Sequence, residues 1–254
     1  MARSRRKISG RTVVVSGAAS GMGRSLAQRL SAHGSPVAIT DIDDIGLKET
    51  ASSLSGPVLS RVLDVRDMQA QQAFAAQVRD WTPTELGAVF NNAGVALTAA
   101  VLGSDPADDQ WLWDINFHGV VNGTRAFLPI LVEQDAGVIV NTSSVFGLAG
   151  VPNQSAYCSA KFAVRGFTDS LRQELRGTGV TAVNVHPGGV NTNIVRNARI
   201  RDDDGAKRDR LVAEFAAVSM TQPARAAQII HRGVAGPNRR SPAITACPKA
   251  GYHA

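Results

Sequence analysis

The sequence predicts an α/β fold, a doubly wound parallel sheet with helices on both faces, arranged as a three-layer sandwich. Short apolar runs rich in Val and Ile alternate with longer helical patterns along almost the whole chain of 254 residues. This alternation is typical of strands joined by helical crossovers. The apolar runs also lack strict polar alternation, which indicates strands that are buried on both faces.

The first half of the chain shows the alternation most clearly. Residues 12–16 (TVVVS) and 37–41 (VAITD) are short and mostly β-branched, residues 58–63 (VLSRVL) are short and mostly apolar, and we expect these runs to form the first three strands. Residues 22–33 and 44–54 are longer runs with helical spacing of their apolar residues, and each fills the gap between two strands.

The same pattern continues toward the carboxyl end, where residues 243–245 add only a weak strand signal. A seventh strand is therefore uncertain from the sequence. In chain order we expect a helix at 67–80, a strand at 88–91, a helix at 106–133, a strand at 138–142, a helix at 155–176, a strand at 180–185 and a helix at 223–234.

The length and composition predict one domain over residues 1–254, with a basic tail at 1–10. Hydrophobic residues make up 44% of the chain and charged residues 19%, which is enough apolar side chain for one large core. Residues 193–219 form an irregular, charge-dense stretch ahead of the last expected helix. It can be a surface loop or a mobile lid over a pocket, and we favour the lid because of its position.

The charge distribution bears on possible partners. The net charge is +6, yet residues 1–11 and 225–254 carry +5 each, so the body of the chain is mildly acidic. A basic tail can bind nucleic acid, and a nucleic-acid binder is one alternative for this protein. Because no recognition-helix pattern or base-stacking aromatic cluster accompanies the charge, we expect no nucleic-acid partner.

Several other classes of protein are disfavoured. The uncharged run at residues 86–104 contains Asn91 and Asn92, so we expect a buried strand and a loop there and no membrane span. No secretory signal is visible, and two cysteines, Cys158 and Cys247, suit a reducing compartment, so a cytoplasmic location is expected. The five histidines lack metal-ligand spacing, and we expect no metal site.

A glycine-rich turn follows the first expected strand. Gly17, Gly21 and Gly23 have the spacing GxxxGxG, with Ser20 and Met22 between them, directly before a helix. Glycines let backbone N–H groups approach a pyrophosphate at the positive end of a helix. An ordinary strand-to-helix turn is the alternative, since a glycine cluster alone is weak evidence.

Acidic residues end the next two strands. Asp41 lies 24 residues after Gly17, where a carboxylate can accept hydrogen bonds from both ribose hydroxyls of adenosine and repel a 2′-phosphate. Neither Ser20 nor Ile42 supplies a cation, so NAD is favoured over NADP. A helix N-cap is the other interpretation of Asp41. Asp64 ends the third strand and can contact the adenine amino group.

Tyr157 and Lys161 are four residues apart in an expected helix, so their side chains share a face. A lysine ammonium about 4 Å from the phenol, at an effective dielectric of ~20, contributes about 4 kcal/mol, enough to lower a pKa by about three units. Ser144, at the end of a strand, can hold a substrate oxygen beside the phenol. Surface decoration and turn-forming serines are the alternatives for these residues.

These residues together resemble the short-chain dehydrogenase/reductase family in its compact single-domain, Rossmann-type form, over residues 11–234. The ordered coincidence of motifs is more specific than any one of them. The motifs are the glycine turn, Asp64, Asn91-Asn92-Ala93-Gly94, Asn116, Ser144, Tyr157-x-x-x-Lys161 and Pro187-Gly188-Gly189-Val190-Asn191-Thr192.

The resemblance implies a role for each matching residue. Tyr157 would be the acid/base, Lys161 would lower its pKa and hold the nicotinamide ribose, Ser144 would orient the carbonyl, and Asn116 would anchor a proton-relay water. The cofactor contacts implied are Gly17, Ser20, Gly21, Met22, Gly23, Asp41, Asp64, Val65, Asn91, Ala93, Gly94, Tyr157, Lys161, Pro187, Gly188, Val190 and Thr192.

The sequence therefore predicts an NAD-dependent oxidoreductase that interconverts a secondary alcohol and a ketone. A catalytically idle NAD-binding regulator on the same fold is the alternative. The resemblance also implies a homotetramer formed through the helices at 106–133 and 155–176. An apolar small-molecule substrate is expected from the side chains that would line its pocket, which are Ala96, Val145, Phe146, Val151 and Ile194.

Overall fold

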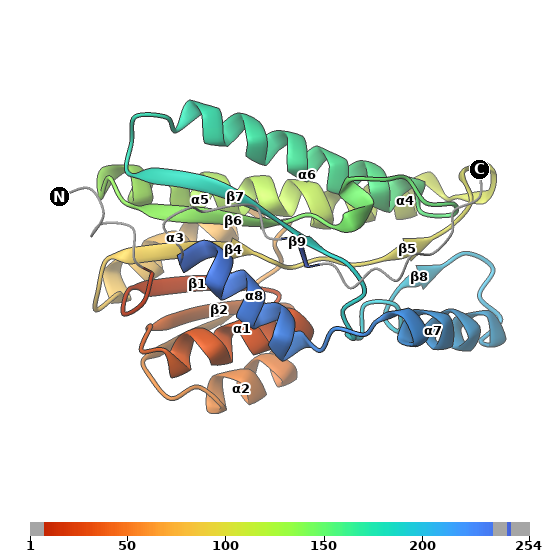
Figure 1. Ribbon diagram of the computed structural model, residues 1–254, viewed down its shortest axis with the longest axis horizontal. Coiled ribbons are helices and arrows are strands. Elements are labelled where there is room, and N and C mark those ends of the chain that lie inside the picture. Colours follow the sequence, from red (N-terminus) through yellow and green to blue (C-terminus); the bar gives the residue numbers. More distant parts are fainter. Residues whose placement is uncertain (1–7, 236–242, 245–254) are drawn as a thin grey trace.

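The computed structural model describes residues 8–235 and 243–244, and its core is a parallel sheet of seven strands in the order β3-β2-β1-β4-β6-β7-β9 (Figure 1). This arrangement confirms the predicted doubly wound α/β fold. The strands are β1 (Thr12–Ser16), β2 (Val37–Asp41), β3 (Val58–Val62), β4 (Leu86–Asn91), β6 (Gly137–Thr142), β7 (Val180–Pro187) and β9 (Ala243–Ile244).

The inner strands β1, β2, β4, β6 and β7 bury side chains on both faces of the sheet, whereas no residue of β3 is fully buried. Val13 and Val15 of β1 pack into one hydrophobic cluster, whereas Val14 between them packs into the other. Val138 and Ile139 of β6 divide between the same two clusters. Because both faces of these inner strands need apolar side chains, their sequences lack polar alternation.

Helices cover the two faces in separate groups (Figure 1). On one face Leu26 and Leu30 of α1 meet Ile230 and Val234 of α8, and on the other Phe74 of α3 packs with residues of α5 and α6. The first group is α1 (Gly21–Ala32), α2 (Asp44–Ser52) and α8 (Pro223–Ala235), and the second is α3 (Met68–Trp81), α5 (Gly119–Glu133) and α6 (Ser155–Glu174).

The helix expected at 106–133 is interrupted. The chain forms α4 (Pro106–Trp113), a π-helical turn η3 (Asp114–His118) and then α5. The backbone N–H of Gly119 donates to the carbonyl of Asp114, five residues earlier, so the turn is wider than in an α-helix. Asn116 lies within this turn and is fully buried. Such π turns occur frequently at functional sites.

Residues 193–219 are more regular than the sequence indicated. They contain β8 (Arg199–Ile200) and α7 (Ala206–Val218), and β8 pairs in parallel with β5 (Leu97–Thr98) outside the main sheet. In this pairing the backbone N–H of Arg199 donates a hydrogen bond to the carbonyl of Ala96. Strands of two residues have no periodicity that a sequence pattern can reveal.

The two ends of the chain also differ from expectation. Ile8 is 1% exposed and belongs to the core cluster, so the basic tail predicted at 1–10 is too long at its inner end. Residues 1–7 of that tail lie outside the described residues. At the other end β9 does form, and it pairs with His186 and Pro187 of β7.

The uncharged run at 86–104 is confirmed as a buried strand, β4, followed by loop, β5 and a short 3₁₀ turn, η2 (Val101–Gly103). Within the part of the chain that the structure describes, no helix has the length and apolarity needed to cross a membrane. In the same residues no group of three or more His, Cys, Asp or Glu side chains is placed to hold a metal ion.

Candidate active site

A cavity of about 460 Å³ lies at the carboxyl ends of β1 to β4. Strand order reverses between β1 and β4, and such switch points are where doubly wound sheets bind ligands. Most of the predicted cofactor residues line the cavity, namely Gly17, Ser20, Gly21, Met22, Gly23, Asp41, Asp64, Val65, Ala93, Gly94 and Thr192.

Other lining residues were not predicted. Those next to a motif, such as Ala19, Ile42 and Asn92, follow from the neighbouring residues. Trp111 and Asn197 come from α4 and from the segment before β8, and no motif marked them. The full set is Ala19, Ile42, Asp43, Leu63, Arg66, Asn92, Val95, Trp111, Ile115, Asn193 and Asn197, together with Ile194, which we expected on the substrate side.

The glycine turn at one end of the cavity requires glycine for steric reasons. Gly17 has a φ of +66°, and a Cβ there would lie 2.7 Å from the Cα of Ala93. A Cβ on Gly23 would collide with the carbonyl oxygen of Gly17. The turn therefore brings bare backbone to the edge of the cavity, as a phosphate-binding loop must.

The first turn of α1 leaves its backbone donors free of a side-chain cap. Its N-cap residue, Ser20, makes no capping hydrogen bond, and no acidic residue lies in the first turn. By contrast, Asp43 and Asp67 cap α2 and α3 with their side chains. Uncapped N–H groups at the positive end of a helix suit a phosphate. These residues fit the pyrophosphate of a dinucleotide cofactor.

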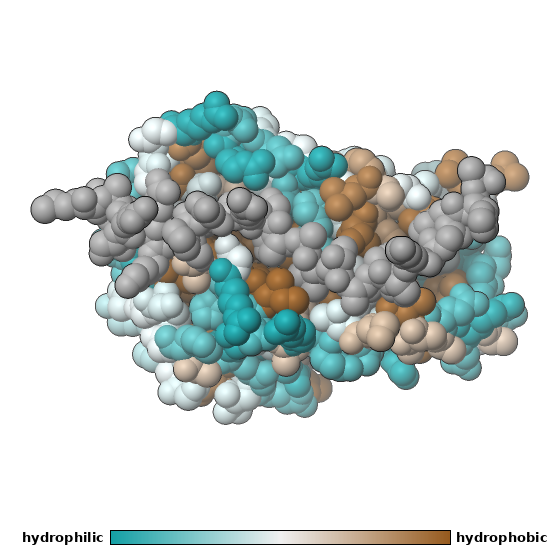
Figure 2. Space-filling model, viewed as in Figure 1, coloured by the Kyte–Doolittle hydropathy of each residue, from teal (hydrophilic) through white to brown (hydrophobic). Residues whose placement is uncertain are grey.

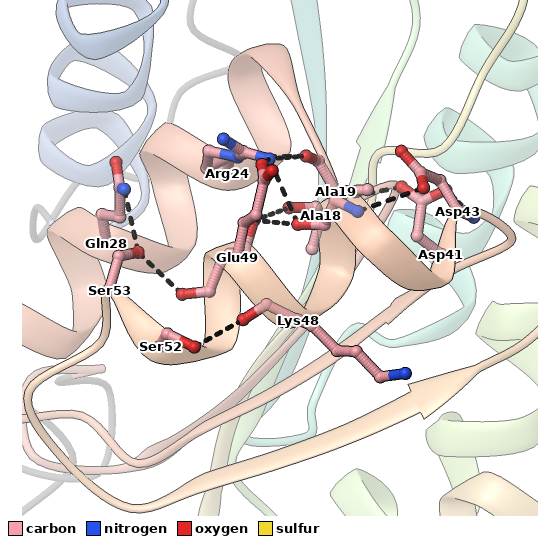
Figure 3. Close-up of polar contacts among 12 residues, drawn as sticks. Ala18, Ala19, Arg24, Gln28, Asp41, Asp43, Lys48, Glu49, Ser52 and Ser53 are labelled. Carbon is pink, nitrogen blue, oxygen red and sulfur yellow. Dashed lines mark hydrogen bonds and ion pairs between the residues drawn. The ribbon is translucent and has the colours of Figure 1, made fainter.

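Asp41 stands beside this turn at the end of β2 (Figure 3). Its Oδ2 accepts the backbone N–H of Ala19 at 2.9 Å, and its Oδ1 accepts that of Asp43 at 3.2 Å. The N-cap of α2 is Asp43, so the alternative that Asp41 is a helix N-cap is wrong. Each carboxylate oxygen has a second lone pair for a ligand hydroxyl.

Asp64, at the next strand end, is paired with Arg66. Both oxygens of Asp64 accept from the Arg66 guanidinium, with distances of 2.6 to 3.1 Å. Hydrogen bonding to Arg66 lowers the pKa of Asp64. Both side chains line the cavity, so an adenine amino group there would meet the ion pair and not an isolated carboxylate.

The four predicted catalytic residues come from three places in the fold. Ser144 follows β6 and begins the short turn η4 (Val145–Gly147), where its Oγ accepts the backbone N–H of Phe146 at 3.1 Å. Tyr157 and Lys161 lie in the first two turns of α6. The ammonium of Lys161 is 5.6 Å from the centre of the Tyr157 ring and donates to the carbonyl of Thr142 at 3.0 Å.

Gly94 connects these residues to the cavity. It lines the cavity wall, and a Cβ there would lie 3.1 Å from Oδ1 of Asn116 and 3.5 Å from Nζ of Lys161. Asn116 itself is fixed by two hydrogen bonds with the backbone of Val95, at 2.8 and 2.9 Å. The predicted catalytic residues Asn116 and Lys161 therefore lie directly behind Gly94, at one end of the cavity.

Burial dominates the acid–base properties of the site. Desolvation raises the pKa of Tyr157 to about 12, and its hydrogen bond with Ser144 opposes this only in part. Desolvation also lowers the pKa of Lys161 to about 8. The sequence predicted that Lys161 would lower the pKa of the phenol, whereas the net pKa of Tyr157 in this structure is raised. The physical reason is the burial of both groups, since Lys161 is only 3% exposed.

Six predicted cofactor residues do not line the cavity, and two of them, Tyr157 and Lys161, are among the predicted catalytic residues described above. The carboxamide of Asn91 is buried and donates to Oγ1 of Thr124 and Oδ1 of Asn141, on the side of α5. Pro187, Gly188 and Val190 lie at and after the end of β7, beside the catalytic group, where the carbonyl of Pro187 accepts from Ser144 at 3.5 Å.

Comparison with known proteins agrees with this geometry. Residues 11–203 match the family described as short chain dehydrogenase. A putative oxidoreductase, SadH, of Mycobacterium tuberculosis (strain ATCC 25618 / H37Rv) is 43% identical over 233 residues, which cover 89% of this chain and 83% of the relative.

Two solved structures share the fold over nearly the whole chain. A short-chain dehydrogenase/reductase from Burkholderia phymatum in complex with NAD superposes with a TM-score of 0.86 at 27% identity, covering 92% of this chain and 89% of the other. A serine dehydrogenase complexed with NADP⁺ superposes with a TM-score of 0.84 at 25% identity, covering 96% and 97%. The chain belongs to the short-chain dehydrogenase/reductase family of oxidoreductases.

Proposed function

We propose that this protein is an NAD(H)-dependent oxidoreductase that interconverts a secondary alcohol and a ketone. The observation that carries the proposal is the arrangement of Asn116, Lys161 and Gly94, which joins the catalytic group to a cavity whose other end is a phosphate-binding turn. An idle regulator on the same fold finds no support, because all four predicted catalytic residues are present.

The residues that line the cavity suit NAD. Gly17, Gly21 and the first turn of α1 would hold the pyrophosphate, and Asp41 would accept hydrogen bonds from the adenosine ribose. Relatives of known structure have been solved with NAD and with NADP⁺, so the choice depends on this chain's own side chains. The Asp41 carboxylate would repel a 2′-phosphate, which favours NAD. When bound, this cofactor supplies the hydride chemistry.

Tyr157 would serve as the acid that protonates the substrate oxygen. Its raised pKa keeps the phenol protonated at neutral pH, which is the form that ketone reduction needs. Ser144, beside it, would donate a second hydrogen bond to the same oxygen as negative charge develops there. Lys161 would orient the cofactor's second ribose, and its charge favours transfer of the Tyr157 proton.

The substrate side of the site is expected to be apolar. Phe146 packs edge-on against Tyr157 with the ring centres 6.1 Å apart, and Val145 lies next to it in η4. Ile194 reaches the cavity from the segment before β8. We propose that residues 193–219 form the lid of this pocket, since Asn193 and Asn197 also line the cavity.

The direct test is turnover with a panel of ketones and secondary alcohols, followed by the absorbance of NADH. Tyr157→Phe should reduce turnover by at least about a hundredfold, because general acid–base catalysis contributes on that scale. Binding of NADH, followed by its fluorescence, should survive in the same variant. Turnover that persists in Tyr157→Phe would remove this residue from the acid/base role.

The homotetramer and the cytoplasmic location also stay proposals. Val132 on α5 is 45% exposed and Phe162 on α6 is 42% exposed, and these are the helices through which we expect subunits to associate. Sedimentation of the purified protein would show a tetramer if this is correct, and Phe162→Glu should then dissociate it. A monomeric wild-type protein would contradict the proposal, and cell fractionation tests the location.

A further inference from the structure

A second, more open cavity of about 390 Å³ adjoins the cofactor cavity. The two cavities share Ala19, Ser20 and Gly21 of the phosphate-binding turn. The second is also lined by Arg24 of α1 and Glu49 of α2, which form an ion pair with a distance of 2.8 Å. No role in the proposed reaction has been given to this pair.

Arg24 is tied to the turn as well as to Glu49 (Figure 3). Its Nε donates to the carbonyl of Ala19 at 3.0 Å, and its Nη2 donates to the carbonyl of Gly46 at 3.1 Å. Asp41 accepts the N–H of the same Ala19 from the other side. The backbone N–H of Ala19 is thus bound by Asp41, the carboxylate proposed to bind the ribose, and its carbonyl is bound by Arg24.

The charges around the two cavities follow a consistent pattern. Among the described residues the cavities are lined by two basic side chains, Arg66 and Arg24, and each is neutralised by a carboxylate. Asp41 and Asp43, in contrast, accept only backbone N–H groups there. The surroundings of the turn therefore have negative charge in excess and hold no unpaired cation for an additional phosphate.

The Arg24–Glu49 ion pair is partly exposed to solvent, which indicates that it contributes little to the stability of the folded protein. The side chains are 31% and 60% exposed, and exposed ion pairs contribute little to the stability of the fold. An anion that binds nearby responds to each charge separately, because Coulomb interactions extend about 8 to 10 Å at physiological salt. Removing the Glu49 charge would leave the positive charge of Arg24 without a neutralising carboxylate, while its hydrogen bonds to the carbonyls of Ala19 and Gly46 remain.

We propose that Glu49 is a specificity-determining residue that favours NAD over NADP by neutralising Arg24. The proposal rests on the proposed function, because it assumes that the adenosine ribose lies beside Asp41. Asp41 repels a 2′-phosphate directly, and Glu49 acts at longer range by cancelling the guanidinium that would otherwise attract it. Discrimination between the cofactors is then shared between two carboxylates on β2 and α2.

The experiment measures dissociation constants of NADH and NADPH for the full chain by fluorescence titration at two salt concentrations. Glu49→Gln keeps the shape and the hydrogen-bonding capacity of the side chain and removes its charge. We expect NADPH to bind about tenfold tighter relative to NADH in this variant, which corresponds to about 1.4 kcal/mol. The gain should shrink at high salt, since both partners are solvent-accessible.

Two further variants assign the effect. Arg24→Met in the Glu49→Gln background should return the NADPH/NADH ratio to the wild-type value or below it. Asp44→Asn is the matched control, because Asp44 is on the same helix, pairs with Lys48 at 2.6 Å and lines neither cavity. Its ratio should stay within about twofold of wild type, in line with the weak effect of exposed charges.

The outcomes separate this inference from the proposed function. A wild-type protein that prefers NADPH overturns the cofactor assignment itself. If the wild type prefers NADH and Glu49→Gln weakens both cofactors equally, the residue is structural and the inference is wrong. The inference is also wrong if the tighter relative binding of NADPH persists when Arg24→Met is added to Glu49→Gln, or if it also occurs in Asp44→Asn. Glu49→Ala, with thermal melting to verify folding, serves as a second variant in each comparison.

Discussion

The two walls of the cofactor cavity are built in opposite ways. One wall is the glycine turn after β1, a strand in which every residue is buried. The other includes the segment 193–219, whose helix α7 has no buried residue. In Figure 2 the visible side of α7 has hydrophilic and weakly hydrophobic residues mixed together. The first wall is held by the core and the second by surface contacts.

The contacts of the second wall are nevertheless specific. The guanidinium of Arg199 stacks 3.7 Å from the centre of the Trp111 ring and pairs with Asp108 at 2.6 Å. Arg208 pairs with Asp203 at 2.6 Å. Such exposed contacts contribute about 1 kcal/mol each or less. We therefore expect fixed geometry of the turn and, if residues 193–219 form the proposed lid, opening at a low cost in free energy.

Replacing one glycine by alanine in each wall tests the difference in rigidity between the two walls. Of the predictions made here, we expect this one to have the largest effect. Gly23→Ala should abolish detectable cofactor binding and lower stability by several kcal/mol, because its Cβ collides with the Gly17 carbonyl. Gly205→Ala, in the lid, has no atom within 4 Å of the new Cβ and only a φ of +81° to strain it. It should cost about 1 kcal/mol, as thermal melting and NADH titration would show.

The buried wall should also determine the pH dependence. Because the pKa of Tyr157 is raised, the phenolate needed for alcohol oxidation is scarce at neutral pH. Oxidation should increase with pH by up to about tenfold per unit from pH 6 upward, whereas ketone reduction, which uses the protonated phenol, should not increase.

Stopped-flow rates in both directions would show this difference. Arg199→Gln, in the lid, should leave the profile unchanged, since it does not touch the catalytic group. Oxidation that is flat across the same range would show that the folded protein does not hold the phenol protonated.

The smallest effect is expected from loosening the lid itself. Arg199→Gln removes both the stacking on Trp111 and the ion pair with Asp108. NADH should dissociate about fivefold faster, as expected from a loss of about 1 kcal/mol. Arg201→Gln is the control, because within residues 8–235 the ion pair of Arg201 is with the neighbouring Asp202, at 3.6 Å. Equal dissociation rates in the two variants would argue against the lid.

The sequence predicted the features that repeat or that have a fixed spacing. The inner strands of the central sheet, such as β1 and β6, were predictable because two buried faces demand apolar residues on both sides of a strand. Gly17 and Gly23 were recognisable because no other residue fits the turn. Tyr157 and Lys161 were linked by their spacing of four residues in a helix.

Features that depend on burial or on distant contacts were not predictable. The π turn around Asn116, the pairing of β5 with β8, and Trp111 in the cavity wall have no local pattern. The pKa of Tyr157 was predicted in the wrong direction because a spacing of residues shows which charges are near and not how much water is excluded.

By itself, then, the sequence determined the family, the inner strands of the sheet and the motif residues that line much of the cavity, because each of these follows from local periodicity or a short motif. Only the tertiary structure decided which groups at the site are buried and which charges are paired. In the folded chain Tyr157 and Lys161 are both buried. The backbone of Ala19 forms hydrogen bonds with Asp41 and Arg24, and Glu49 forms an ion pair with Arg24. The degree of desolvation and the pairing of charges depend on groups that are far apart in the sequence, and only folding brings these groups together.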